Sequence, residues 1–107
     1  MKAIIYQKNE PTFRIDPDKR LYDKNEYKKV YVLELNERQE RQFREDVDAL
    51  LEEMFEIFNI RRPRDFEGHS LSVEDVVEFR DLEEVEMETD KFICDCFGWR
   101  RIEWEDK

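Results

Sequence analysis

Residues 36–59 read NERQERQFREDVDALLEEMFEIFN, and this stretch decides the expected fold. Its apolar side chains recur mostly three or four positions apart, as on one face of an amphipathic helix: Phe43, Val47, Leu50, Leu51, Met54, Phe55 and Phe58. Asn36 followed by Gln39 is typical of a helix N-cap with its capping-box partner. Arg62-Pro63 opposes continuation of the helix far beyond Asn59. The pattern therefore predicts one long helix over residues 37–58.

Strand patterns flank this helix on both sides. β-Branched and aromatic residues, interrupted by turn residues such as Asp, Pro and Asn, mark the expected strands. These strands are 2–7, 27–35, 73–79, 82–90, 91–97 and 102–104, with loops at 16–26 and 65–72. The order predicts an α+β fold in which a small antiparallel sheet of about four to six strands packs against the one long helix. The 107 residues are expected to form a single domain, 1–107.

The composition predicts a small core inside a heavily charged shell. Charged residues are 45% of the chain, against 39% hydrophobic and 13% aromatic residues. No apolar run is long enough to span a membrane, and the apolar stretch near the start is too short for a signal peptide. Cys94 and Cys96 are too close in sequence to staple a fold. These features favour a cytoplasmic protein that makes no membrane contact.

The charge is distributed unevenly along the chain. The net charge is −10, but residues 1–44 carry eleven Lys or Arg and eight carboxylates, a balance of +3. Residues 45–107 carry eight Lys or Arg and twenty-one carboxylates, a balance of −13. An acidic surface repels nucleic acid and attracts basic protein surfaces. Direct nucleic-acid binding is therefore not expected.

Few residues offer catalytic or metal-binding chemistry. His69 is the only histidine, and the sequence places no catalytic partner beside it. A metal site would need Cys94, Cys96 and His69 together, whereas two cysteines facing the core are the simpler interpretation. Two glycines, Gly68 and Gly98, exclude a glycine-rich phosphate loop. No catalytic residue, metal or cofactor is expected, although a small enzyme that uses His69 remains an alternative.

The most distinctive segment is residues 84–90, which read EVEMETD. Strict alternation is typical of a half-buried strand, which would place Glu84, Glu86, Glu88 and Asp90 in one outward row with a spacing of about 6.8 Å. Such a row resembles a stretch of DNA phosphates, which advance about 3.4 Å per step along the axis while winding around it. Plain solvation, protection of a sheet edge and cation binding are the alternatives. The candidate partner-binding residues are Glu74, Glu78, Asp81, Glu83, Glu84, Glu86, Glu88 and Asp90.

The segment Gly68-His69-Ser70-Leu71-Ser72-Val73-Glu74-Asp75-Val76-Val77 carries a resemblance to a known family. Together with Phe58-Asn59-Ile60, Pro63, Asp65-Phe66 and Asp95-Cys96-Phe97-Gly98-Trp99, it resembles the YodL-like domain family over roughly residues 47–100. The resemblance implies a domain carried by mobile elements of Gram-positive bacteria, with no established catalytic role. It also implies structural roles for Gly68, His69, Ser70 and Asp75, with His69 tying the loop and Asp75 capping the turn before Val76.

Charge and family setting together predict a function. The chain is expected to be a small, non-enzymatic inhibitor from a mobile element or phage, of the anti-CRISPR or anti-restriction class. Its expected partner is the basic surface of a nucleic-acid-binding protein such as a Cas nuclease, whose DNA-binding arginines the carboxylate row would occupy. The alternative is an accessory interaction module of conjugation or replication machinery, which would bind through its sheet or through Trp99 and Trp104.

Overall fold

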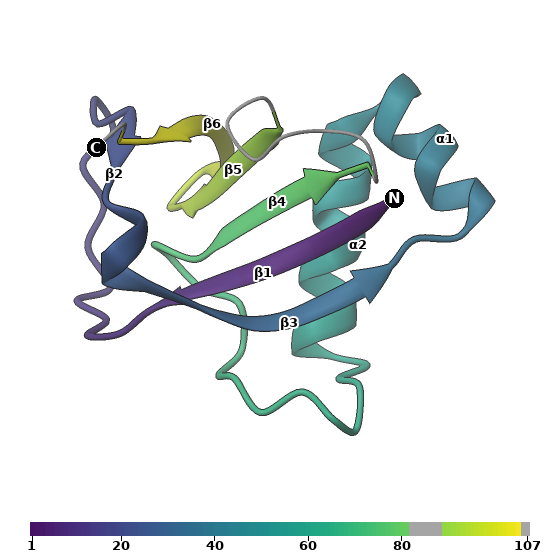
Figure 1. The fold of residues 1–107 in the computed structure, drawn as a ribbon, viewed down its shortest axis with the longest axis horizontal. Coiled ribbons are helices and arrows are strands. Elements are labelled where there is room, and N and C mark those ends of the chain that lie inside the picture. The colour runs from purple at the N-terminus through teal and green to yellow at the C-terminus, as the bar shows by residue number, and fades with distance from the viewer. Residues whose placement is uncertain (82–88, 106–107) are drawn as a thin grey trace.

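The computed structural model describes residues 1–81 and 89–105 of the chain. Strands and helices of this part follow one another as drawn in Figure 1. They are β1 (Lys2–Lys8), β2 (Leu21–Tyr22), β3 (Tyr27–Glu34), α1 (Glu37–Glu45), α2 (Val47–Asn59), β4 (Val76–Arg80), β5 (Asp90–Asp95) and β6 (Gly98–Trp104). A 3-10 turn at Lys24–Glu26 precedes β3. No helix of the described part is long and apolar enough to cross a membrane.

The helical stretch corrects the expectation of one long helix over residues 37–58. It forms two shorter helices, α1 and α2, that are separated at Asp46. Asp46 has φ −158° and ψ 83°, and its side chain accepts a hydrogen bond from the Ala49 N–H at 3.2 Å. The residue thus ends α1 and caps the first turn of α2, where the side-chain oxygen satisfies a free backbone donor. The expected ends of the stretch are confirmed, because Asn36 and Gln39 form the capping box and α2 ends at Asn59.

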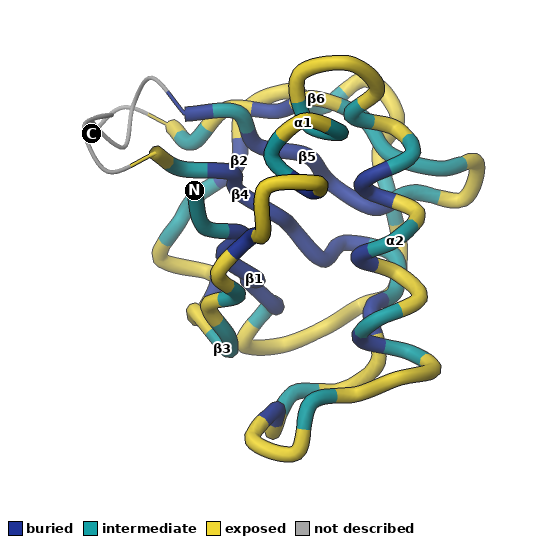
Figure 2. The backbone as a smooth tube through the Cα atoms, turned by 90° about the vertical axis from the view of Figure 1, so that its right-hand side faces the viewer, coloured by how far each residue is buried: buried dark blue, intermediate teal, exposed yellow. Residues whose placement is uncertain are grey.

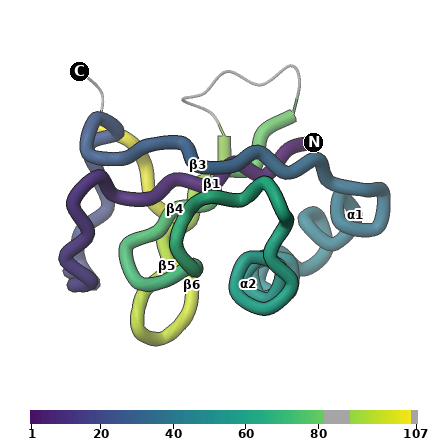
Figure 3. Tube along the Cα trace, turned by 90° about the horizontal axis from the view of Figure 1, so that it is seen from below, coloured from purple at the N-terminus to yellow at the C-terminus, as the bar shows by residue number. Residues whose placement is uncertain are grey.

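The sheet is mixed rather than antiparallel throughout, which corrects the second part of the expected fold. Its strand order is β2-β6-β5-β4-β1-β3. All neighbouring pairs are antiparallel except β2 and β6, where Leu21 lies opposite Glu103 in a parallel register. The sheet curves into a half-barrel (Figure 3), and α2 runs across one of its faces behind β1 and β4 (Figure 1). The fold is therefore a curved mixed sheet with two short helices.

Each face of the sheet carries its own core, because side chains alternate between the faces along a strand. The helix-covered face packs Ala3, Ile5, Leu50, Leu51, Met54, Phe58, Val77, Phe79 and Phe92. The opposite face packs Ile4, Tyr6, Tyr22, Tyr27, Val76, Ile93 and Ile102, with Ile15 and Trp104 beside them. Figure 2 shows that buried positions concentrate in the strands and on the sheet-facing side of α2, whereas α1 is largely exposed. Ile15 and Tyr22, from the segment between β1 and β3, pack on the face that the helices leave open.

Strand boundaries differ from the expected ones around the family-like motif. β4 begins at Val76 and not at Val73, because residues 72–75 form a turn. The expected loop at 16–26 contains β2 and the 3-10 turn, while β6 is longer than the expected 102–104. Residues 82–88 of the expected strand 82–90 lie outside the described residues, so the outward row of carboxylates stays a prediction.

Candidate functional site

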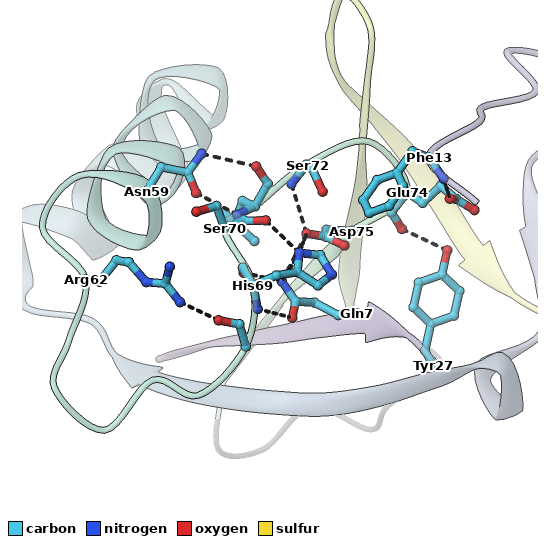
Figure 4. Close-up of polar contacts among 12 residues, drawn as sticks. Gln7, Phe13, Tyr27, Asn59, Arg62, His69, Ser70, Ser72, Glu74 and Asp75 are labelled. Atoms are coloured by element: carbon cyan, nitrogen blue, oxygen red, sulfur yellow. Dashed lines mark hydrogen bonds and ion pairs between the residues drawn. The ribbon is translucent and has the colours of Figure 1, made fainter. Parts of the chain in front are cut away.

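The motif segment 68–75 is held against the end of β1 by Gln7 (Figure 4). The Gln7 amide nitrogen donates to the His69 carbonyl at 2.7 Å and to Asp75 Oδ2 at 3.1 Å. Gln7 Oε1 accepts from the His69 N–H at 3.2 Å. A Cβ on Gly68 would lie 2.4 Å from Gln7 Oε1, so only glycine permits this close approach. Gln7 therefore links β1 to the motif through both ends of one buried amide.

Asp75 forms the centre of this hydrogen-bond cluster. Its Oδ2 accepts from the Ser72 N–H at 2.9 Å, and its own N–H donates to the Ser72 carbonyl at 3.1 Å. These two bonds close the turn that leads into β4. The side chain is only 2% exposed, and burial raises the pKa of the Asp75 carboxyl to about 7 against the opposing effects of Ser72, His69 and Gln7. Asp75 is thus a carboxyl group whose charge depends on pH near neutrality.

The His69 ring lies over Asp75 with its outer edge toward solvent. Nδ1 is 3.8 Å from Asp75 Oδ2 and 2.8 Å from the Ser70 carbonyl, and the side chain is 39% exposed. Nδ1 also lies 3.3 Å from the Gln7 amide nitrogen, and because the Ser70 carbonyl can only accept, a hydrogen bond at that 2.8 Å contact requires Nδ1 to donate. Nδ1 contacts a backbone carbonyl, a carboxamide and a carboxyl group, none of which is a hydroxyl or thiol nucleophile. The arrangement orients an imidazole and holds the loop, with His69 and Ser70 at its surface.

Glu74, an expected partner-binding residue, is buried and bonded within the molecule. Its backbone has a positive φ of 86°, and Oε1 accepts from the Thr12 N–H at 2.8 Å, the Thr12 hydroxyl at 2.9 Å and the Phe13 N–H. Lys8 Nζ lies 3.0 Å from Oε2. Burial pushes the pKa of Glu74 up, but the Lys8 ammonium and the Thr12 donors outweigh it, so the pKa is lowered. Glu74 is therefore a clamp on the segment after β1, which corrects its placement on a partner surface.

Glu78, also expected to bind a partner, is likewise buried inside the protein. It alternates with Val77 and Phe79 in β4 and points into the face opposite the helices, where it is fully buried. Its carboxylate accepts from the Tyr6 hydroxyl at 2.9 Å and from the Thr89 hydroxyl, and it pairs with Arg80 at 3.2 Å. Lys91, also fully buried, donates to the Thr89 carbonyl at 3.0 Å. Glu78 therefore belongs to a buried polar network.

Two expected partner-binding residues remain at the surface. Asp81 has a side chain that is 51% exposed, and that of Asp90 is 38% exposed. Asp90 pairs with Arg101, and Asp81 lies 3.8 Å from the N-terminal ammonium. The other expected residues, Glu83, Glu84, Glu86 and Glu88, lie outside the described residues.

Other sequence expectations change in detail. Cys94 is buried in β5 and Cys96 is exposed in the following turn, so the two do not both face the core. Among residues 1–81 and 89–105, no group of three or more His, Cys, Asp or Glu side chains could hold a metal ion. Trp99 and Trp104 are packed against the two cores, whereas Phe97 at the β5–β6 turn is 100% exposed.

Sequence reasoning missed Gln7, although a signal was present. Along β1, Gln7 lies an even number of positions from Ala3 and Ile5, so its side chain is on the same face of the strand as theirs. A polar side chain on this buried face needs hydrogen-bond partners inside the protein. Its partners lie more than 60 positions away, so no local pattern could identify them.

The chain belongs to the YodL-like domain family, whose model matches residues 5–104. The match extends well beyond the motif region and includes β1, so Gln7 and its partners in segment 68–75 all lie within it. No curated protein and no solved structure matches the chain.

Proposed function

We propose that this protein is a non-enzymatic inhibitor, from a mobile element or phage, of a nucleic-acid-binding defence protein. In this proposal its carboxylates occupy Lys and Arg side chains that would otherwise hold DNA phosphates. The class of target is a Cas nuclease or a restriction enzyme, acting in the cytoplasm of a bacterial cell. Such a target presents a positive surface shaped for a regular array of negative charge.

The observation that carries the proposal is the concentration of charge in segment 81–90. These ten residues contain six carboxylates and no Lys or Arg: Asp81, Glu83, Glu84, Glu86, Glu88 and Asp90. Its described end residues, Asp81 and Asp90, are both at the surface. The internal roles of Glu74 and Glu78 reduce the proposed binding set to this segment. A high density of like charge costs free energy in the isolated protein, and a basic partner would relieve that repulsion.

Competition for phosphate-binding residues has a clear signature. Long-range attraction speeds association at low salt, and screening weakens it as the ionic strength rises. We therefore expect inhibition of DNA binding that fades between low and moderate salt. Cleavage should be blocked because the target cannot hold DNA, and not because its catalytic centre is altered.

The test is a titration of the purified protein against DNA binding and cleavage by a panel of CRISPR nucleases and restriction enzymes. The informative variant combines Glu84→Gln, Glu86→Gln and Glu88→Gln. A matched control combines Glu10→Gln, Glu26→Gln and Glu67→Gln, three exposed carboxylates elsewhere that change the net charge equally. The proposal predicts weaker inhibition by the first variant alone, with an unchanged circular dichroism spectrum in both. Equal inhibition by wild type and both variants would contradict the role of the segment.

One observation favours a second function, an accessory interaction module of conjugation or replication machinery. Phe97 is fully exposed, while Gly98 with φ 130° and the Asp95 carboxylate, which accepts from the Phe97 N–H at 2.8 Å, define its turn. An aromatic side chain that a hydrogen-bonded turn presents to solvent is suited to anchor a protein partner. Under this function, Phe97→Ala should abolish partner capture from a host lysate, and salt should have little effect. If the Phe97→Ala variant inhibits a nuclease in a salt-sensitive way, this second function is contradicted.

A further inference from the structure

A groove of about 620 Å³ lies between α1 and α2 on their solvent side. Arg38 and Gln42 line it from α1, and residues of α2 and its C-terminal end complete it. The groove exists because the chain turns at Asp46, which brings the first turn of α1 beside the middle of α2. Arg38 there pairs with both carboxylate oxygens of Glu53 at 2.8 Å. A single straight helix would have no such groove.

The floor of the groove is partly apolar. Phe55, which the sequence assigned to the core-facing stripe, instead lines this groove and is 38% exposed. Ile60, just beyond the end of α2, is 78% exposed and lines the same groove. Ala49, about 1.7 turns before Phe55 on α2, also lines the groove, so its lining includes both small and large apolar groups. Apolar side chains in a concave site of this size are typical of ligand and peptide sites.

The groove is lined by carboxylates along α2, while Arg38 of α1 and Arg61 beyond the end of α2 line it elsewhere. Glu52 and Glu56 line it at an i, i+4 spacing, and Asp48 extends the row by one more turn; all three are exposed. Like charges at this spacing destabilise a helix by a few tenths of a kcal/mol per pair. Glu53 is already bound by Arg38 and by the Gln39 amide at 2.6 Å, whereas Glu56 makes a looser, 3.6 Å contact with the exposed Arg61. Glu52 and Glu56 thus remain accessible to a partner's cations.

We propose that this groove docks a basic amphipathic helix of a protein partner. An apolar side chain of that helix packs on Phe55 and Ile60, and Lys or Arg side chains one turn apart pair with Glu52 and Glu56. The apolar floor favours a protein side chain over a phosphate-bearing ligand, and the exposed row of Asp48, Glu52 and Glu56 along α2 favours a basic helix over an acidic one. This inference rests on the proposed function, because the basic helix is taken to belong to the same target protein. It adds a second contact with that target, outside segment 81–90.

The test uses a designed probe peptide of about 16 residues, long enough for four helical turns. Its Leu residues follow an i, i+3, i+4 pattern and its other face carries Lys. A second peptide has every Lys replaced by Glu. Binding is followed by fluorescence anisotropy, and the site is mapped by amide chemical shifts in the labelled protein. Saturable binding of the Lys peptide alone, with shifts centred on residues 49–61, is the expected result.

Variants separate docking in the groove from general attraction to an acidic protein. Phe55→Glu should weaken binding of the Lys peptide at least about tenfold, because it removes the buried anchor. Val32→Glu is the matched control, since Val32 lies on β3 with a similar exposed fraction of 40% and receives the same added charge. Glu52→Gln with Glu56→Gln should weaken binding at low salt. Equal affinities of Phe55→Glu and Val32→Glu, or shifts centred on Asp81 and Asp90, would overturn the inference.

The nuclease assay distinguishes this inference from the proposed function. If wild type inhibits a target and Phe55→Glu inhibits it equally well, the groove is not part of that interface, while the proposed function stands. If the Lys peptide docks in the groove but no nuclease of the panel is inhibited, the groove is supported as a docking site and the proposed function is contradicted.

Discussion

Two groups of carboxylates lie near the two ends of the loop that joins α2 to β4. Those near its C-terminal end, Glu74 in the last turn of the loop and Glu78 in β4, are buried and accept hydrogen bonds from residues of β1, the segment after it, and Thr89. Those before it, Glu52 and Glu56, lie on the outer surface of α2. In the sequence the two groups look alike, and only the location of their donors separates them. A count of carboxylates thus overstates the acidic surface, because part of the charge stabilises the core region.

The largest expected effect is that of Glu78→Ala. Its removal takes the acceptor from the buried Tyr6 hydroxyl and one carboxylate from Arg80, at a position of β4 that is fully buried. Loss of one partner from a buried charged network costs about 3–5 kcal/mol of unfolding free energy. Urea unfolding should show this loss or a failure to fold. A change below about 1 kcal/mol would mean that the network does not support the sheet.

The next effect is that of Glu74→Ala, which removes the clamp on Thr12 and Phe13. We expect a loss of about 2–3 kcal/mol, since a buried charged acceptor of several donors is removed. Hydrogen exchange at the amides of Thr12 and Phe13 should accelerate. Glu10→Ala, an exposed carboxylate of the same segment, is the control and should leave both rates unchanged. Unchanged exchange in Glu74→Ala would show that the clamp contributes nothing.

Asp75, beside Glu74 at the same end of the loop, should make the unfolding free energy depend on pH. Its pKa is about 7 in the folded protein and near 3.8 in the unfolded chain, so between these values the folded state holds an extra proton. The unfolding free energy therefore falls as pH rises from about 4 to about 7, by at most about 1.4 kcal/mol per unit, and then levels off. Asp75→Asn should remove this slope, measured by urea unfolding from pH 5 to pH 8. Identical slopes for the two proteins would contradict a neutral Asp75 in the fold.

The smallest effect is expected for Glu52→Gln and Glu56→Gln on α2. Both side chains are exposed, so the unfolding free energy should change by less than about 0.5 kcal/mol. Relief of like-charge repulsion within the row that includes Asp48 favours a slight gain over a loss. Thermal unfolding at low salt measures this most sensitively. A large loss of unfolding free energy in either variant would mean that these residues support the fold as Glu74 and Glu78 do.

Local patterns predicted the elements that depend on neighbours in sequence. The capping box at Asn36 and Gln39 and the end of the helical stretch at Asn59 follow from residues a few positions apart. The break at Asp46 was hidden, because Phe43 and Val47 keep the helical spacing across it while the Asp46 side chain caps Ala49. A polar residue that ends one helix and starts the next leaves the hydrophobic period intact.

Long-range features of the candidate site could not be read in this way. The burial of Glu78 depends on Tyr6, and that of Glu74 on Lys8 and Thr12, all of them more than 60 positions away. The parallel pairing of β2 with β6 joins residues from opposite ends of the chain. The motif around Gly68 and Asp75 was recognisable, but its function as a junction with β1 required Gln7.

The most direct measurement is DNA binding by the nuclease panel in the presence of three proteins at two salt concentrations. These are the wild type, the variant of Glu84, Glu86 and Glu88, and the matched variant of Glu10, Glu26 and Glu67. The proposed function predicts inhibition by the wild type and the matched variant that fades with salt, and weak inhibition by the first variant. Inhibition that is equal in all three proteins, or that does not depend on salt, would contradict it.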